Sequence, residues 1–183
     1  MRITLLDGDI AQSGAEFKPY LDTLEKALCD NNCQVTRFRL SEMKIAYCTG
    51  CFGCWLKKPG QCVIDDDAGA VRRAMINSDL VLFCSPVSMG MISSALKKTL
   101  DRMIGLVLPF MEFVQGELHH RRRYEQYPKL GLILGKYGDT DDEDIQIIEQ
   151  SFRRLAINFH STLKVSRLAG APVAEVVNEI NCL

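Results

Sequence analysis

The sequence predicts an α/β fold, a doubly wound parallel sheet with helices on both faces. Along the 183 residues, short apolar runs alternate with segments whose apolar residues recur at helical spacing, which is typical of strand–helix–strand units. Two of the runs, residues 80–84 and 130–134, are apolar throughout, as expected of central parallel strands buried on both faces. We expect a single domain over residues 1–183, a length that can enclose a full hydrophobic core.

The first strand and helix follow from short patterns near the N-terminus. Residues 2–6 form an apolar run suited to a buried strand. A helix is predicted over about residues 18–31 by three leucines at helical spacing, and Pro19 is tolerated because it falls in the first turn. These leucines are Leu21, Leu24 and Leu28.

Residues 34–40 alternate in polarity and predict a second strand at an edge of the sheet. We expect Phe38 and Leu40 to point inward and Arg37 and Arg39 to face water.

The central elements continue the alternation. The carboxylates of residues 65–67 suit the N-terminus of a helix, where they meet free N–H groups and the positive end of the dipole. The strand at 80–84 follows, and Ser85 and Pro86 are expected to end it. The next helix is predicted by Leu96, Leu100 and Met103.

The second half is less regular. Residues 105–128 carry no clear pattern and are treated as an insertion. The strand at 130–134 precedes a helix that the acidic run 141–144 opens. A last strand is expected at 163–166 and a short helix at 172–180.

Five strands in this arrangement predict the flavodoxin-like order 2-1-3-4-5, in which ligands bind beyond the carboxyl ends of strands one and three. Three loops lie there: residues 8–14, 86–90 and 135–138. The candidate cofactor-binding residues on these loops are Gly8, Asp9, Gln12, Ser13, Gly14, Pro86, Val87, Ser88, Met89, Gly90, Gly135, Tyr137 and Gly138.

The first of these loops can cradle a phosphate, because a strand-to-helix turn with Gly and Ser offers backbone N–H groups at a helix N-terminus. It is neither a Walker A sequence nor G-x-G-x-x-G. Asp9 would repel a phosphate at close range, so we expect its carboxylate to point away. Taken alone, each loop is equally typical of an ordinary strand–helix turn.

Four cysteines fall within a cysteine-rich loop over residues 46–64. They are Cys48, Cys51, Cys54 and Cys62, spaced C-x2-C-x2-C-x7-C. Thiolates this close together on one loop are typical of a cubane iron–sulfur cluster. Val63 stands where a ferredoxin loop has proline, so this is a different cluster loop. Zinc, which usually takes two separated pairs, and free or redox-switching thiols remain alternatives, whereas a disulfide framework would need an oxidising compartment.

Two blocks of the sequence resemble a known family. Ser85-Pro86-Val87, followed by Leu96-Lys97 and Leu100-Asp101-Arg102, resembles a block of the NAD(P)H-dependent FMN reductases. The cysteine motif, followed by Asp65-Asp66, resembles that of the iron–sulfur flavoproteins within this superfamily. The departures from the family pattern are Asp9, the absence of Pro and Arg in the first loop, and Ser88 in place of an aromatic residue.

The resemblance implies an oxidoreductase with FMN at the switch point, a [4Fe-4S] cluster on the four cysteines, and a homodimer or homotetramer. Electrons would pass between NAD(P)H or a ferredoxin and an unidentified acceptor. No catalytic nucleophile or base is expected, because the flavin carries the chemistry. Two alternatives stay open: a cluster-free FMN or quinone reductase, and a non-catalytic electron carrier or redox-sensing protein.

The charge composition limits which kinds of binding partner we expect. With a net charge of -1, the chain has no overall bias toward nucleic acid or anionic membrane. One basic run, residues 119–123, is expected on an exposed loop or lid, either as a solvated face or as a contact for a phosphate of NADPH. The N-terminal apolar run is too short for a signal peptide, and no stretch approaches the roughly 20 residues of a membrane span, so we expect a cytoplasmic location.

Overall fold

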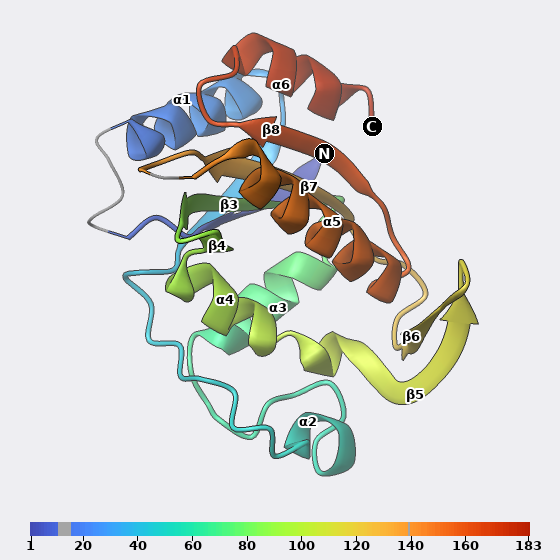
Figure 1. Ribbon diagram of the computed structural model, residues 1–183. Coiled ribbons are helices and arrows are strands. Elements are labelled where there is room, and N and C mark those ends of the chain that lie inside the picture. Colours follow the sequence, from blue (N-terminus) through green and yellow to red (C-terminus); the bar gives the residue numbers. More distant parts are fainter. Residues whose placement is uncertain (11–15, 139) are drawn as a thin grey trace.

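A central sheet with five parallel strands, in the order β2-β1-β3-β7-β8, forms the middle of the computed structural model (Figure 1). The structure describes residues 1–10, 16–138 and 140–183. The strands are β1 (Arg2–Asp7), β2 (Gln34–Arg39), β3 (Leu80–Ser88), β7 (Lys129–Gly135) and β8 (Leu163–Leu168). The predicted strand order, with the second strand at an edge, is confirmed.

Helices cover both faces of this sheet (Figure 1). One face packs against α1 (Phe17–Asp30) and α6 (Val173–Asn181). The other packs against α3 (Ala68–Ile76), α4 (Ser94–Asp101) and α5 (Asp142–Asn158). Within the described ranges, no helix is long and apolar enough to cross a membrane.

The middle strand β3 explains the continuous apolar run at residues 80–84. Leu80 and Leu82 belong to the core under α1 and α6, whereas Val81 and Phe83 belong to the core under α3, α4 and α5. A strand buried on both faces needs apolar side chains at every position, so its sequence does not alternate.

The expectation that Ser85 and Pro86 end this strand is wrong. β3 continues to Ser88, because it stays paired with β7 as far as Pro86 opposite Gly135. It then turns back as a hairpin with β4 (Met91–Ile92). Since β1 pairs with β3 only as far as Cys84, the missing N–H of Pro86 removes no bond to β1.

Arg37 is also placed differently from the expectation. Its side chain is only 3% exposed and forms ion pairs with Asp7, Asp22 and Glu25. The face of β2 that carries Arg37 is covered by α1, and two carboxylates of this helix, Asp22 and Glu25, meet the guanidinium there. Arg39 is exposed, as expected.

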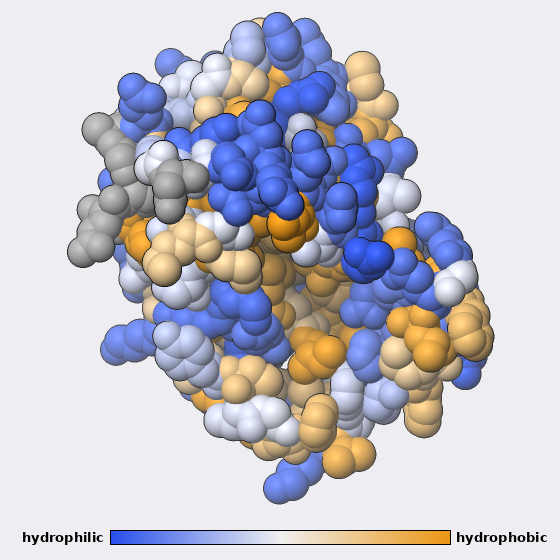
Figure 2. All heavy atoms as spheres, viewed as in Figure 1, coloured by the Kyte–Doolittle hydropathy of each residue, from blue (hydrophilic) through white to orange (hydrophobic). Residues whose placement is uncertain are grey.

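The insertion after α4 is a two-stranded antiparallel hairpin, β5 (Val107–Val114) and β6 (Glu117–Arg122), reached through the short 3-10 helix η1 (Ile104–Leu106). The basic run therefore lies mainly on a strand, which corrects the expected loop or lid. His119 is buried and packs inward, because residues alternate between the faces of the hairpin. The other face of the hairpin is apolar and exposed (Figure 2). Met111, Phe113 and Leu118 lie on this face and are exposed. Phe110 is exposed as well, but it precedes Met111 in the irregular part of the hairpin and is not on this face.

Candidate functional site

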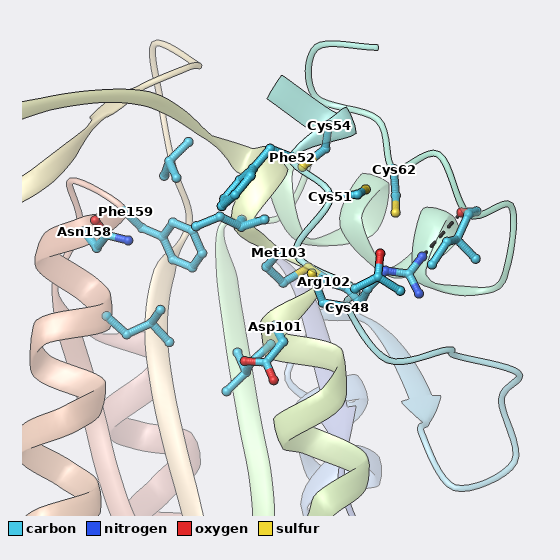
Figure 3. Close-up of a pocket in the computed structure, with 17 residues that line it drawn as sticks. Cys48, Cys51, Phe52, Cys54, Cys62, Asp101, Arg102, Met103, Asn158 and Phe159 are labelled. Carbon is cyan, nitrogen blue, oxygen red and sulfur yellow. Dashed lines mark hydrogen bonds between the residues drawn. The ribbon is translucent and has the colours of Figure 1, made fainter. Parts of the chain in front are cut away.

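All four cysteines of the motif line one cavity of about 400 Å³ at the C-terminal end of α4 (Figure 3). The opposite wall comes from the end of α5, with Asn158 and Phe159, and from Val107 at the start of the hairpin. Leu100, Met103 and Ile104 add an apolar floor. The structure therefore joins residues of the cysteine loop with three elements that lie 38 or more positions further along the chain.

The cysteine loop takes its shape from two residues with left-handed backbone and one close approach. Gly50 has φ 65° and Phe52 has φ 53°, so the chain bends sharply on both sides of Cys51. The short helix α2 (Gly53–Leu56) then begins. A Cβ on Gly53 would lie 2.5 Å from Cγ1 of Val63, so only glycine allows the two limbs of the loop to pack this closely.

Trp55 fixes α2 to the rest of the molecule. Its indole Nε1 donates to the carbonyl oxygens of Ile104 (3.2 Å) and Val107 (3.0 Å). Its ring stacks on Phe52, with ring centroids 5.3 Å apart. Sequence reasoning missed this residue, although a lone tryptophan inside a cysteine loop is a usable signal for an anchor.

A buried ion pair between Arg102 and Asp66 closes the loop. Their side chains are 1% and 10% exposed, and both guanidinium nitrogens Nη1 and Nη2 reach the carboxylate (2.7 and 2.9 Å). Arg102 also donates to the carbonyl oxygens of Ala46 (2.7 Å) and Ile64 (3.3 Å), which flank the first and last cysteines. We call this group the Arg102 clamp.

The ion pair and the hydrogen bonds of the clamp shift the pKa values of Asp66 and Arg102 so that both stay charged. Burial alone would raise the pKa of Asp66, but Arg102 and the N–H groups of Ala46 and Ala68 outweigh it and lower that pKa. Burial likewise opposes the charge on Arg102, and Asp66 together with the nearby Cys62 raises its pKa nevertheless. Both groups are therefore ionised at neutral pH.

The cavity contains donor groups suited to a cluster. Nε of Arg102 is buried and has no hydrogen-bond partner in the described part of the chain, and Arg102 lines the cavity with the four thiols. Hydrogen bonds from the N–H of Gly53 and the hydroxyl of Thr49 lower the pKa of the Cys51 thiol, whereas burial raises that of Cys54. All eight cysteines are free thiols. Within residues 1–10, 16–138 and 140–183, no three His, Cys, Asp or Glu side chains are arranged to hold a single metal ion.

The switch-point loops meet at the other end of α4. Gly8 follows β1, and its N–H donates to the carbonyl oxygen of Cys84 (2.8 Å). A Cβ on Gly8 would lie 2.8 Å from Oγ of Ser93 and 2.9 Å from that carbonyl oxygen, so the site requires glycine. Ser93 in turn caps α4, with its Oγ accepting from the N–H of Leu96.

Asp7 and Arg37 hold the loop that follows β1 through a buried ion pair and a hydrogen bond. The Asp7 carboxylate accepts from Nε of Arg37 and from the backbone N–H of Asp9, both at 2.9 Å. Burial would lower the pKa of Arg37, but hydrogen bonds to Glu25, Asp22 and Asp7 reverse the effect and raise it. Gln12, Ser13 and Gly14 lie outside the described residues.

The other predicted switch-point residues lie on two neighbouring turns. Pro86, Val87 and Ser88 belong to β3, whereas Met89 and Gly90 form the tip of the turn with φ of 51° and 71°. Met89 is 87% exposed, so its side chain extends into solvent.

Gly135 ends β7, and a Cβ there would lie 2.7 Å from the ring of Tyr137 and 2.8 Å from that of Phe17. Burial, together with the charges of Asp9 and Glu16, raises the pKa of Tyr137. Gly138 is exposed, with φ 58°. The structure thus brings the described residues of all three predicted loops to the carboxyl edge of the sheet.

The model of the family described as NADPH-dependent FMN reductase matches residues 1–116, more than half of the chain. The chain belongs to this family. An iron-sulfur flavoprotein of Archaeoglobus fulgidus is 37% identical over 84 residues, which are 46% of this chain and 37% of that relative. The chain therefore spans less than half of the length of this curated relative.

Solved structures of low sequence identity share the fold of this family member. An FMN-dependent NADH-azoreductase of Bacillus anthracis, solved in complex with FMN, has a TM-score of 0.63 at 11% identity, covering 97% of this chain and 92% of that one. An NAD(P)H:quinone oxidoreductase of Methanothermobacter marburgensis has a TM-score of 0.61 at 14% identity, covering 99% and 93%. These likenesses confirm the flavodoxin-like fold.

Proposed function

We propose that this protein is an FMN-dependent oxidoreductase of the iron–sulfur flavoprotein type. FMN would bind at the switch point, and a [4Fe-4S] cluster would bind Cys48, Cys51, Cys54 and Cys62. Electrons would come from NAD(P)H or a ferredoxin and go to a small-molecule or protein acceptor. The observation that carries the proposal is the common cavity of the four thiols.

The residues present fit both groups. Four thiols on one cavity match the ligand number of a cubane cluster, and the unpartnered Nε–H of Arg102 is a donor for sulfur at the same wall. The described residues of the three switch-point loops lie together at the carboxyl edge of the sheet, where a doubly wound fold binds its ligand. When bound, the flavin supplies hydride chemistry and the cluster supplies single-electron steps.

The chain's own residues hold and orient these groups. Gly8 and Ser93 fix the turn after β1, and the backbone around Pro86, Val87 and Ser88 forms the second wall of the flavin site. The Arg102 clamp holds both limbs of the cysteine loop around the cavity. No residue of this chain is assigned a proton-transfer role.

The two sites lie at opposite ends of α4, with Ser93 at one end and Arg102 at the other. Eight helical residues span about 12 Å. The cysteine loop follows the edge strand β2, and we propose that it serves the flavin of a neighbouring subunit in a homodimer or homotetramer. The exposed apolar face of the hairpin, with Met111 and Phe113, offers a surface for such assembly.

A cluster-free NAD(P)H-dependent FMN or quinone reductase is the second candidate. The fold neighbours named azoreductase and quinone oxidoreductase favour it. A non-catalytic electron carrier or redox sensor is the third candidate, supported by the absence of an aromatic residue at Ser88.

NAD(P)H oxidation separates these candidates. Anaerobic protein loaded with FMN should oxidise NADPH or NADH and pass electrons to a one-electron acceptor dye whose potential lies above that of NAD(P)H. Replacing Cys51 by alanine should leave flavin reduction intact and abolish fast transfer to the dye. Equal dye reduction by this variant would favour the cluster-free reductase, and no NAD(P)H oxidation or ferredoxin-driven reduction at all would favour the carrier.

A further inference from the structure

A second pocket, of about 280 Å³, lies on the outer side of the cysteine loop against α3. It contacts Cys62 and Asp66 from the loop, and Gly69, Arg72 and Arg73 from the helix. This volume lies just below the roughly 300–1,000 Å³ of pockets that enclose a whole drug-sized ligand. The pocket therefore suits a small ligand or the charged head of a larger one.

Arg72 is the unusual residue of this pocket. It is only 8% exposed, and its Nη1 is fully buried with no hydrogen-bond partner among the described residues. No carboxylate in the described part of the chain forms an ion pair with it, in contrast to Arg37 and Arg102. A buried cation without a counter-ion is costly, so a guanidinium in this state points to a missing anion.

The second guanidinium of the pocket lies close to the first. A Cβ on Gly69 would lie 3.5 Å from Nη1 of Arg73 and 3.9 Å from Nη2 of Arg72, so both side chains reach over the same glycine. Two convergent guanidinium groups are the arrangement that binds phosphate and carboxylate oxygens.

The acidic groups of the pocket do not cancel this charge. The Asp66 carboxylate is already occupied by Arg102 and by the N–H groups of Ala46 and Ala68. Asp65 is exposed to solvent at the rim. The interior of the pocket is therefore left with an excess of positive charge.

We propose that this pocket binds a phosphate group or another small oxyanion between Arg72 and Arg73. The two guanidinium groups that would bind the oxyanion belong to the polypeptide and are not among the proposed cluster or flavin ligands, although Cys62 lines both cavities. Since it shares Cys62 and Asp66 with the cysteine loop, an oxyanion bound there would also brace that loop from outside.

Calorimetric titration of the purified protein with inorganic phosphate tests this site, in a chloride buffer of constant ionic strength. We expect saturable binding with a dissociation constant of about 1 mM or lower. Arg72→Met should weaken it by about tenfold or more, because a buried charge-assisted contact is lost. Arg39→Met is the matched control, since Arg39 is exposed on β2 and its loss changes the net charge equally.

Two further arms identify the source of the oxyanion. If phosphate competes with NADPH but not with NADH, the pocket takes the 2′-phosphate of the nucleotide. If phosphate binds without affecting either nucleotide, the pocket takes a free oxyanion. No saturable binding of phosphate to the unaltered protein would overturn the proposal, and this result does not depend on any variant folding. Equal affinities in Arg72→Met and Arg39→Met would overturn it as well.

Discussion

The two ends of α4 hold two different kinds of loop. At its N-terminal end, the switch-point loop continues directly from the paired strand β1: the Gly8 N–H donates to a carbonyl oxygen of β3, and the Ser93 hydroxyl caps the helix. Asp7, buried beside Arg37, also accepts from the N–H of Asp9 in this loop. At its C-terminal end, the cysteine loop lies outside the sheet and is held mainly by the buried charges of Arg102 and Asp66 and by Trp55.

This difference predicts which substitutions should displace each loop. The switch-point loop takes its position from the paired strands as well as from the Asp7–Arg37 pair, so added bulk at the tightly packed Gly8 is the direct way to disturb it. The cysteine loop depends on one ion pair that joins both its limbs, so removing one partner should release the whole loop.

The largest expected effect is at the thiols themselves. Cys51→Ala should reduce bound iron from about four atoms per chain to a trace, because one of four cluster ligands is lost. Flavin content should stay unchanged, because the switch point lies at the other end of α4. Iron and FMN analysis of anaerobically purified protein measures both.

Cys29→Ala is the matched control for this change, because Cys29 is exposed and does not line the cavity. Iron retained equally by both variants would exclude Cys51 as a ligand.

Breaking the Arg102 clamp should have the next largest effect. Arg102→Met leaves the Asp66 carboxylate buried without its partner, which typically costs 3–5 kcal/mol. Urea unfolding of the cofactor-free protein gives the free energy, and iron content of the anaerobic protein should fall with it.

Lys97→Met provides a neighbouring comparison. Lys97 pairs with Asp101 one turn away on the same helix, but both side chains are about half exposed, so the loss should be about 0.2–0.5 kcal/mol. If the two variants lost similar stability, the clamp would not be what holds the cysteine loop.

A larger side chain at Gly8 tests the switch-point loop. Gly8→Ala places a methyl group within 3 Å of a serine hydroxyl and a backbone carbonyl, which should cost about 1–3 kcal/mol and weaken FMN binding. Fluorescence titration with FMN measures the second effect. Gly116→Asn, at an open position of the hairpin turn where φ is 84°, should change both quantities little, because asparagine tolerates a left-handed conformation. Normal FMN affinity in Gly8→Ala would show that the turn adapts.

The smallest expected effect is a pH dependence of the clamp. The folded state lowers the pKa of Asp66 below its ordinary value of 3.8, so the clamp stabilises the fold fully above about pH 4. This contribution is lost as the pH falls through the lowered pKa. The difference in unfolding free energy between the unaltered protein and Asp66→Asn should therefore be constant from pH 5 to 7 and shrink in acid. A difference that grew in acid would contradict the ion-pair account.

The sequence predicts the sheet well because burial on both faces leaves a direct pattern, as at residues 80–84. It also predicts that the four cysteines lie close together, because their spacing is a local property of one loop, whereas the cavity they line also needs walls from α4, α5 and the hairpin. The inward position of Arg37 could not be predicted, since it depends on Asp22 and Glu25 of a helix packed against the strand.

The hairpin at residues 107–122 was missed for a related reason. Its strands combine exposed aromatic residues with a basic run, so their sequence lacks the pattern of a half-buried strand. The Arg102 clamp joins residues 36 positions apart, and only the fold shows that they meet.

The most direct test of the proposed function is a count of iron, acid-labile sulfide and FMN per chain in protein purified without oxygen, together with its absorbance spectrum. The account predicts about four irons and four sulfides per chain with bound flavin, and a broad cluster absorbance that dithionite bleaches. Flavin without iron, in protein never exposed to oxygen, would contradict the assignment of the cysteine cavity to a cluster.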